Sequence, residues 1–396
     1  MTIDSSASAG TPTARQSSLR DHNLGIVLRT IAQQGELSRA AIAQHTGLTR
    51  ATVSRLGQDL LDARLVSELA SSMDGNPGRP GTPLVLSGDR FVGVGLEINV
   101  DYVAGRAIAL DGTVIAEFYE AHEASLSDPV EALARLTPHI NLLMATLREH
   151  TVVGTILGVP GLVDVTTGTV LVAPNLGWRS VQPAGILGID IEVMNDVNAQ
   201  GYAAAYESPG KPRGSDTFLY VSGDVGIGSA LVSDGVLGHG RHGWAGEIGH
   251  VVIEPDGPLC GCGGRGCLEC YAGKRAILEA AGLPPAVPDG VLETLLDDGD
   301  DAAHAAVQRA GWALGIAISD AVNMLDVSDI ILGTGLTPLV PWLRDHMMSQ
   351  LEWRPLASEF LNFTVQAAPA DSIPCSTGGA LLALNRLLAN PAAFIS

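Results

Sequence analysis

The chain has 396 residues, of which 46% are apolar, and a formal net charge of −20 at pH 7. This length suggests two or three domains, and no stretch reaches the 18 or so consecutive apolar residues of a membrane-spanning helix. The first residues are rich in Ser, Thr and Ala and lack the apolar middle of a secretory signal. We therefore expect a disordered lead-in over residues 1–20, no membrane segment and a cytoplasmic protein.

The acidic charge is spread unevenly along the chain, which limits where a nucleic acid can bind. Residues 1–88 contain eight arginines and seven acidic residues, a charge of +1 that leaves −21 for the remainder. An acidic body disfavours general polyanion binding. Contacts with nucleic acid, if the protein makes any, are expected to be confined to the N-terminal segment.

Three helices are predicted near the N-terminus. Apolar residues recur with helical spacing from Asp21 until Gly35 ends the pattern. Ser38 can cap a second helix that ends at Gly47, and Thr49 can cap a third. Helices joined by short glycine turns at this spacing are typical of a helix-turn-helix.

Two short strands are expected to follow these helices and to complete a winged helix-turn-helix over residues 21–88. Residues 65–69 and the segment PLVLS, residues 83–87, are rich in Leu and Val and flank a Gly/Pro-rich turn. The alternative is a three-helix packing module whose polar third helix is merely solvated. The DNA-binding interpretation is favoured because short hydroxyls and guanidinium groups suit phosphates and base edges.

The predicted DNA contacts come from the outward face of the third helix and from the tip of the wing. Asp59 and Asp62, near the C-terminal end of that helix, carry negative charges that would repel DNA phosphates. The wing arginine suits a narrow minor groove, although a solvated loop arginine is the simpler alternative. The candidate residues are Thr49, Arg50, Thr52, Ser54, Arg55 and Arg79.

From Phe91 onward, predicted strands and helices alternate as in α/β proteins. We expect two lobes, one over residues 91–195 that a C-terminal helix at 376–396 completes, and one over residues 196–375. The acidic segment LETLLDDGDD, residues 292–301, is expected to be a surface loop.

Four of the five cysteines lie within eleven residues. Cys260, Cys262 and Cys267, together with His250, offer three thiolates and one imidazole, a closed tetrahedral set typical of structural zinc. The intervening glycines allow the tight turns of a zinc knuckle. An iron–sulfur cluster and uncoordinated thiols are the alternatives. Cys270 is a possible substitute ligand, but its spacing fits less well, and we leave it outside the site.

The segment HGWAGEIGHVVIEPDGPLCGCGGRGCLE, residues 242–269, resembles the signature of the ROK family (repressor, open reading frame, kinase). The segments GVPGLVD, APNLGW and MNDVNAQGYAA also resemble parts of that family, so the similarity covers residues 91–390. The resemblance implies a mixed α/β fold in which a winged helix-turn-helix precedes a two-lobed actin/hexokinase-like (ribonuclease H-like) ROK domain.

The resemblance also implies a sugar site beside the zinc loop. Carboxylates and a carboxamide supply acceptors and donors for vicinal hydroxyls, and metal coordination fixes one imidazole nitrogen while the other meets the ligand. Any one of these acids alone would be assigned to the solvated surface. It is their joint spacing that favours a site. The implied sugar-binding residues are Asn195, Asp196, Glu247, His250 and Glu269.

Two loops favour a regulator over a kinase within this family. Where a ROK kinase has an Asp-Gly-Gly-Thr-type turn, this chain reads LEINV, residues 96–100, whose side chains block close approach to phosphates. Asp224 and Val225 stand where kinases offer Gly and Thr, and an acid there would repel ATP. Asp196, the position of the kinase base, is kept. A sugar kinase with an appended module and a zinc-stabilised protein-interaction module remain the alternatives.

We therefore expect a non-enzymatic repressor of carbohydrate uptake or catabolism genes, similar to the xylose- or N-acetylglucosamine-responsive members of the family. A sugar or sugar derivative would release it from operator DNA. A homodimer or homotetramer is expected, and dimer symmetry implies a partly palindromic operator.

Overall fold

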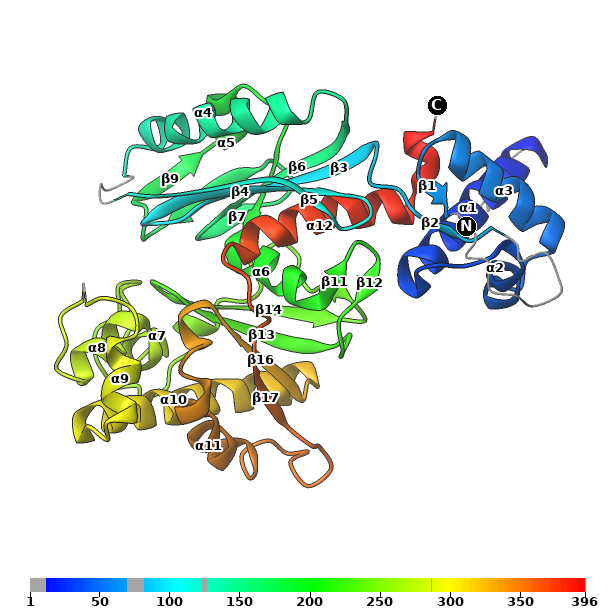
Figure 1. Cartoon of the computed structure of the whole chain (residues 1–396). Coiled ribbons are helices and arrows are strands. Elements are labelled where there is room, and N and C mark those ends of the chain that lie inside the picture. The colour runs from blue at the N-terminus through cyan, green and yellow to red at the C-terminus, as the bar shows by residue number, and fades with distance from the viewer. Residues whose placement is uncertain (1–11, 70–81, 123–126, 286, 396) are drawn as a thin grey trace, which may run out of the picture.

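The protein is described by a computed structural model that covers residues 12–69, 82–122, 127–285 and 287–395. An N-terminal helical domain packs beside the first of two α/β lobes, and the second lobe lies below the first in Figure 1. Within the described residues, no helix is both long enough and apolar enough to cross a bilayer.

The N-terminal domain contains the three helices and two strands that the sequence predicts. Its elements are α1 (Pro12–Gln34), α2 (Arg39–Thr46), α3 (Arg50–Asp62), β1 (Val66–Glu68) and β2 (Leu84–Leu86). The hydroxyls of Ser38 and Thr49 cap α2 and α3 by accepting backbone N–H groups, and Gly47 ends α2 in a left-handed conformation. The two strands pair antiparallel, as expected for a wing.

The first helix begins at Pro12, not at Asp21. Part of the segment that we expected to be a disordered lead-in, residues 1–20, is therefore helical; residues 1–11 lie outside the described part of the chain. Proline is well tolerated in the first turn, and the Ala, Arg and Gln residues that follow are good helix formers. The sequence prediction placed the start where the apolar repeat begins, which marks only the packed part of the helix.

The first lobe is built on a five-stranded sheet with the order β10-β6-β3-β4-β5. Helix α4 packs on one face, together with α5, and α12 packs on the other. A small antiparallel sheet, β7-β8-β9, lies beside it. The elements are β3 (Phe91–Ile98), β4 (Tyr102–Ala109), β5 (Val114–Ala121), α4 (Pro129–Thr146), β6 (Thr151–Val159), β7 (Leu162–Asp164), β8 (Thr169–Ala173), β9 (Trp178–Val181), α5 (Pro183–Leu187) and β10 (Glu192–Asn195).

The second lobe repeats the sheet of the first. Its order is β15-β14-β13-β16-β17, and in both sheets three antiparallel strands adjoin two strands that run parallel to the central one. The strands are β13 (Phe218–Gly223), β14 (Ile227–Ser233), β15 (Val236–Leu237), β16 (Asp329–Gly333) and β17 (Thr364–Ala367). The helices are η1 (Ile248–His250), α7 (Glu269–Ala272), α8 (Lys274–Ala280), α9 (Val291–Asp297), α10 (Asp301–Leu325), η2 (Thr334–Leu336) and α11 (Val340–Leu351).

The expectation of a surface loop at residues 292–301 was wrong for most of that segment, because α9 is a helix. Leu292 and Leu296 are buried one helical turn apart, whereas Glu293 is only partly buried and Asp297 is exposed. The acidic composition therefore describes one face of a short helix instead of a loop.

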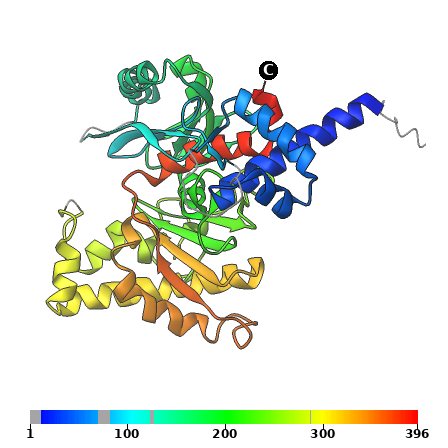
Figure 2. The ribbon, with the colours of Figure 1, turned by 45° about the vertical axis from the view of Figure 1, so that its right-hand side comes forward.

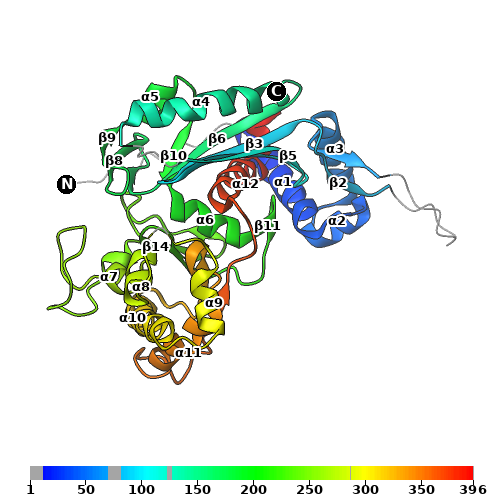
Figure 3. The same cartoon turned by 60° about the vertical axis from the view of Figure 1, so that its left-hand side comes forward.

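Two helices join the lobes. Helix α6 (Asp196–Ala205) packs on the second sheet, α12 (Pro374–Ala389) packs on the first, and the two helices contact each other (Figure 3). Glycines allow close approach here: a Cβ at Gly95 of β3 would clash with the backbone of Ser376, and one at Gly378 with the backbone of Ala199. Backbone-to-backbone packing of this kind holds β3, α12 and α6 together as a tight unit.

The C-terminal helix also reaches the N-terminal domain. In Figure 2, α12 (red) runs through the first lobe towards α1 (blue). The Arg29 side chain donates to the backbone oxygen of Ala389 at 3.3 Å, and Gly210, between β11 (Tyr206–Ser208) and β12 (Lys211–Pro212), packs against Ala32 of α1. The short helix η3 (Pro391–Phe394) adds to this contact, and the apolar core of the helical domain is continuous with residues of α12.

Candidate metal centre and adjoining polar cavity

The four predicted metal ligands come together in space. One nitrogen of His250 and the sulfurs of Cys260, Cys262 and Cys267 all lie within 4.8 Å of one another. The Nδ1 atom of His250 faces Cys260 Sγ at 3.9 Å, and Cys262 Sγ lies 3.8 Å from Cys267 Sγ. Three thiols and one imidazole at this separation form a donor set that fits a tetrahedral ion. The residues present therefore can hold a metal.

The turns of this loop use the glycines as the sequence suggested. Gly263 and Gly266 adopt positive φ values of 92° and 65°, a region that other residues rarely enter. The N–H of Gly264 donates to Cys262 Sγ at 3.4 Å, as backbone groups often do around bound thiolates. Cys270 donates instead to the backbone oxygen of Pro258 and is not part of the four-residue set.

A polar cavity of about 260 Å³ adjoins the metal centre, and all five predicted sugar-binding residues line it. They come from three separate stretches of the chain: the junction of β10 and α6, the η1 segment and the start of α7. The sequence alone did not show that these stretches meet; the family resemblance implied it. The lining residues include Asn195, Asp196, Glu247, His250 and Glu269.

Asn195 and Asp196 are positioned by the start of α6. The Asn195 side chain caps that helix by accepting the N–H of Asn198 at 3.1 Å, and its Nδ2 donates to the Gly161 oxygen at 3.1 Å. Asp196 is buried, and burial raises the pKa of its carboxyl to about 7, although a hydrogen bond from the Val197 N–H opposes this. A carboxyl that titrates near neutrality can accept or donate hydrogen bonds according to pH.

Glu269 and Glu247 reach the cavity from the second lobe. The Glu269 carboxylate accepts the N–H of Ile227 at 3.2 Å, and a Cβ at Gly226 would lie 2.5 Å from its Oε2. The glycine is therefore needed for this approach. Glu247 Oε2 lies 4.0 Å from Nε2 of His250, the ring nitrogen opposite the one that faces Cys260. One imidazole thus joins the metal set to the cavity wall.

Several lining residues were not singled out from the sequence. Asn175 lies in the APNLGW segment, which was noted for its resemblance but not for this side chain. A Cβ at Gly226 would lie 3.6 Å from its Nδ2, so Asn175 and Glu269 both approach this glycine. Asn99 and Ser222 also line the cavity. A carboxamide in a quoted family segment was the available signal for Asn175. Asn99 lies in the LEINV segment, which was noted for its departure from the kinase turn and not as part of the sugar site.

A hydrogen-bonded network closes the space between the loop that joins β3 to β4 and the loop that joins β13 to β14. Asn99, from the loop after β3, donates through Nδ2 to Asp224 Oδ2 at 3.2 Å in the loop after β13. The hydroxyl of Tyr102 donates to Glu97 Oε1 at 2.5 Å. Glu97 is fully buried, and that burial raises its pKa to about 8, with Asp196 and Asp224 adding to the effect. The lobes are therefore in direct polar contact at the point where LEINV faces Asp224.

We expect Glu97→Gln to stabilise the protein above neutral pH. The pKa of Glu97 is about 8 in the folded state against 4.5 unperturbed, so the folded state binds more protons between these values and stability falls as pH rises. Gln keeps the acceptor for Tyr102 and has no charge to bury. At pH 8 the unfolding free energy of E97Q, measured by urea denaturation, should exceed that of the wild type by a few kcal/mol. At pH 5 the difference should shrink. The exposed Glu149→Gln control should show neither effect, and equal stability of wild type and E97Q at pH 8 would contradict the assignment.

The proposed DNA-contacting face is solvent exposed. Thr49, Arg50, Ser54 and Arg55 are exposed and Thr52 is partly buried, with Thr49 occupied as the helix cap. Among the described residues, Arg50 and Arg55 have no ion-pair partner, whereas Asp59 is neutralised by Arg20 at 2.9 Å. The repulsion of DNA phosphates expected from Asp59 is thereby reduced. Arg79 lies outside the described residues.

Comparison with known proteins gives two family matches. A model described as the ROK family matches residues 94–385, and one described as an IclR helix-turn-helix domain matches residues 26–70. A Bacillus subtilis (strain 168) protein named xylose repressor is 27% identical over 346 residues, which cover 86% of this chain and 89% of that protein. The Escherichia coli (strain K12) DNA-binding transcriptional dual regulator NagC is 28% identical and covers 80% of each chain.

Solved structures share the fold. A ROK family transcriptional regulator described as a homologue of E. coli MLC has a TM-score of 0.77 at 24% identity and covers 95% of this chain and 99% of its own. A ROK family glucokinase from Streptomyces griseus, in complex with glucose and AMPPNP, has a TM-score of 0.61 at 25% identity and covers 74% and 98%. The predicted mixed α/β fold, a helix-turn-helix domain followed by two hexokinase-like lobes, is confirmed.

Proposed function

The chain belongs to the ROK family, and from this we propose that it is a sugar-responsive repressor that binds operator DNA through its N-terminal domain. One observation carries the proposal: a helix-turn-helix with exposed, unpaired arginines is joined to a ROK domain in a single chain. Relatives that align over most of their length are named xylose repressor and N-acetylglucosamine repressor. DNA contact is assigned to Thr49, Arg50, Thr52, Ser54, Arg55 and Arg79.

The sugar effector would bind in the cavity beside the metal centre. Its walls offer four carboxyl groups, three carboxamides and an imidazole nitrogen, a set that can hold several vicinal hydroxyls at once. A volume of about 260 Å³ is suited to a monosaccharide or a small derivative. We assign effector binding to Asn195, Asp196, Glu247, His250 and Glu269.

The bound metal is proposed to be zinc with a structural role. A closed Cys₃His set leaves no position for an activated water, so the metal would shape the loop and not perform chemistry. The ligand Cys267 stands two residues before Glu269, and the ligand His250 itself lines the cavity. Zinc would therefore preorganise two walls of the effector site.

Phosphoryl transfer is the second candidate function, because Asp196 stands at the position of the kinase base. The contact between Asn99 and Asp224 argues against it. This contact fills the space between the two loops that would have to bind the phosphates of ATP, and the carboxylate of Asp224 would repel those phosphates. We therefore propose that the protein is not an enzyme and that the loops have lost phosphate binding.

Helix α12 offers a route from the effector to the DNA-binding domain. Near its start, Cys375 packs against Gly158, beside Asp196 on the cavity floor, and its end contacts α1. Sixteen helical residues span about 24 Å. Closure of the lobes around an effector would tilt α12 and thereby shift α1. The effector can drive this change only if it binds the DNA-competent and DNA-incompetent forms with unequal affinity. In a homodimer or homotetramer, this shift would change the spacing of two recognition helices relative to a palindromic operator.

The proposal is tested by measuring how the zinc-loaded protein binds labelled DNA from upstream of its own gene, at defined salt and with a panel of sugars. Sequence-dependent binding that one sugar weakens would support the repressor and identify its effector. Consumption of ATP with those sugars, without DNA binding at any salt concentration, would overturn it in favour of the kinase.

Arg50→Ala is expected to weaken operator binding by roughly 10- to 100-fold without changing sugar affinity. The exposed Arg50 side chain lies in the first turn of α3, where recognition helices meet the DNA. Fluorescence anisotropy at several salt concentrations should also show a smaller salt slope. Arg148→Ala, an exposed arginine in the first lobe, should bind operator like the wild type. Unchanged operator affinity in R50A would exclude this face of α3.

A further inference from the structure

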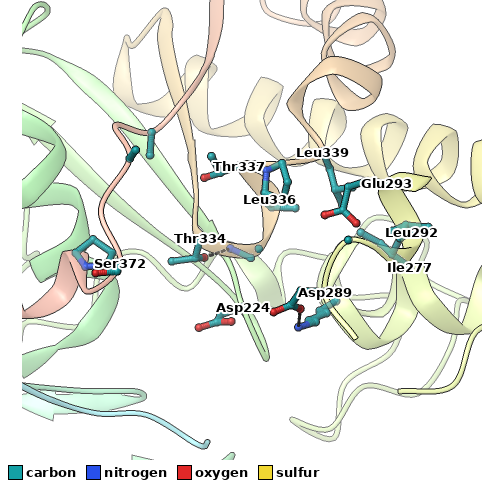
Figure 4. A pocket seen from close by; sticks show the side chains of 18 of the residues that line it. Asp224, Ile277, Asp289, Leu292, Glu293, Thr334, Leu336, Thr337, Leu339 and Ser372 are labelled. Atoms are coloured by element: carbon teal, nitrogen blue, oxygen red, sulfur yellow. Dashed lines mark hydrogen bonds and ion pairs between the residues drawn. The ribbon is translucent and has the colours of Figure 1, made fainter. Parts of the chain in front are cut away.

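A second cavity, larger than the one beside the metal, opens on the other side of Asp224. Its volume is about 660 Å³, and it lies among β13, α8, α9 and the η2 segment (Figure 4). Asp224 lines both cavities, so a ligand in either one lies near this residue. Nothing in the proposed repressor function uses this second space.

One wall of the cavity is apolar. Ile277 and Leu278 come from α8, Leu292 from α9, and Leu336 and Leu339 from the η2 segment and the residues before α11. Figure 4 shows Ile277, Leu292, Leu336 and Leu339 on the side nearest the helices. A wall of this kind accommodates an aliphatic or aromatic body and gains free energy by taking it out of water.

The polar lining is strongly acidic. Asp224, Asp289, Glu293 and Asp371 line the cavity, against one lysine, Lys274. That lysine is already paired with Asp289 at 3.0 Å, a contact drawn in Figure 4. Asp371 is paired with an arginine that is not part of this lining. Among the described residues Asp224 and Glu293 form no ion pair, although the positive charge of Lys274 attracts Asp224. The cavity therefore repels anions and attracts positive charge.

Two tyrosines complete the cavity beside Asp224. Tyr102 and Tyr119 stack with ring centroids 5.0 Å apart, and the Tyr119 side chain is 58% exposed. The pKa of Tyr119 is raised by burial of its hydroxyl and further by the negative charges of Asp101 and Asp224. Aromatic faces next to carboxylates are the surroundings in which proteins bind organic ammonium groups, through cation–π and ionic attraction together.

We propose that this cavity binds an organic cation, a molecule that joins an ammonium group to an aliphatic or aromatic body. The ammonium group lies between the tyrosines and Asp224, and the body lies on the leucine wall, where Glu293 adds a further negative charge to the lining. The same lining disfavours nucleotides and sugar phosphates, whose negative charges would meet unpaired carboxylates. The proposal does not depend on the assignment of the sugar effector or of operator DNA.

Three probes with one indole body and different charges test it on the full-length, zinc-loaded protein. Isothermal titration calorimetry is run with tryptamine (cation), tryptophol (neutral) and indole-3-propionate (anion). Tryptamine should bind at least ~10-fold more tightly than tryptophol, and indole-3-propionate should bind most weakly of the three. Equal affinities for the three probes, or no binding of tryptamine at millimolar concentration, would overturn the proposal.

A pair of variants locates the site. Glu293→Gln removes one lining charge and should weaken tryptamine binding roughly 3- to 10-fold while leaving tryptophol unchanged. Glu279→Gln removes an exposed carboxylate of α8 outside the lining and should leave both affinities unchanged. Equal effects of the two substitutions would mean that tryptamine is attracted by general surface charge, which contradicts a specific site. Because sugar and DNA are absent from these titrations, their outcome is separate from that of the repressor test.

Discussion

Replacing Cys262 with serine is expected to abolish metal binding and to destabilise the second lobe. The Cys262 sulfur is one of four donors within 4.8 Å, and a hydroxyl does not replace a thiolate as a zinc ligand. Losing a structural metal typically costs about 3–5 kcal/mol or more of folding free energy. The bound metal should fall from one equivalent to none by elemental analysis, and thermal unfolding should begin at a lower temperature.

The same substitution should weaken sugar binding, because His250 and the chain leading to Glu269 lose their common anchor. Cys270→Ser is the matched control: it changes a cysteine of the same loop that lies outside the four-residue set. It should keep its metal, its unfolding temperature and its sugar affinity. Retention of one equivalent of zinc in C262S, with wild-type stability, would refute the assigned ligand set.

Features that depend on neighbouring residues were predictable from the sequence. Ser38 and Thr49 cap α2 and α3 as expected, because a cap is a contact between a side chain and the backbone three residues later. The four candidate metal ligands were likewise identified from their spacing, since short glycine-containing segments leave few ways to arrange three thiols.

Features that depend on distant residues were not predictable from local patterns. The bond between Asn99 and Asp224 joins positions 125 residues apart, and it forms only because two sheets of the same strand order place their β-hairpin turns face to face. The sequence showed no repeat that would have revealed this duplication. Convergence of Asn195 with Glu269 was implied by the family resemblance, not by periodicity.

The two errors have one physical origin. Both the early start of α1 at Pro12 and the helix α9 were missed because these segments were judged by their polar composition. In an amphipathic helix, only the buried face has to be apolar. A helix end without apolar residues and a two-turn helix with a polar outer face give weak periodic signals. Tertiary packing, such as the burial of Leu292 and Leu296, decides the conformation of such segments.

Asp196→Asn is expected to yield a repressor that only a much higher sugar concentration releases from DNA. Asp196 lines the cavity and is buried, so its carboxylate is well placed to accept hydrogen bonds from sugar hydroxyls. Replacing a charged acceptor by a neutral amide removes about 1.5–3 kcal/mol, or roughly 10- to 100-fold in sugar affinity. Operator binding in the absence of sugar should be unchanged, and the sugar concentration that releases DNA should rise by the same factor. Asp190→Asn, an exposed position before β10, is the matched control.

The pH dependence of stability separates this loss of function from misfolding. The pKa of Asp196 is about 7 in the folded state, above the unperturbed 3.8, so the wild type loses stability as pH rises between these values. Asn has no charge to bury, and D196N should therefore unfold at a higher temperature than wild type at pH 8 and show a smaller advantage at pH 5. A variant that is more stable, still bound to operator and insensitive to sugar would locate the effector at Asp196. Normal sugar release by D196N, or equal losses of sugar and DNA binding, would contradict the assignment, because the two sites lie in separate domains.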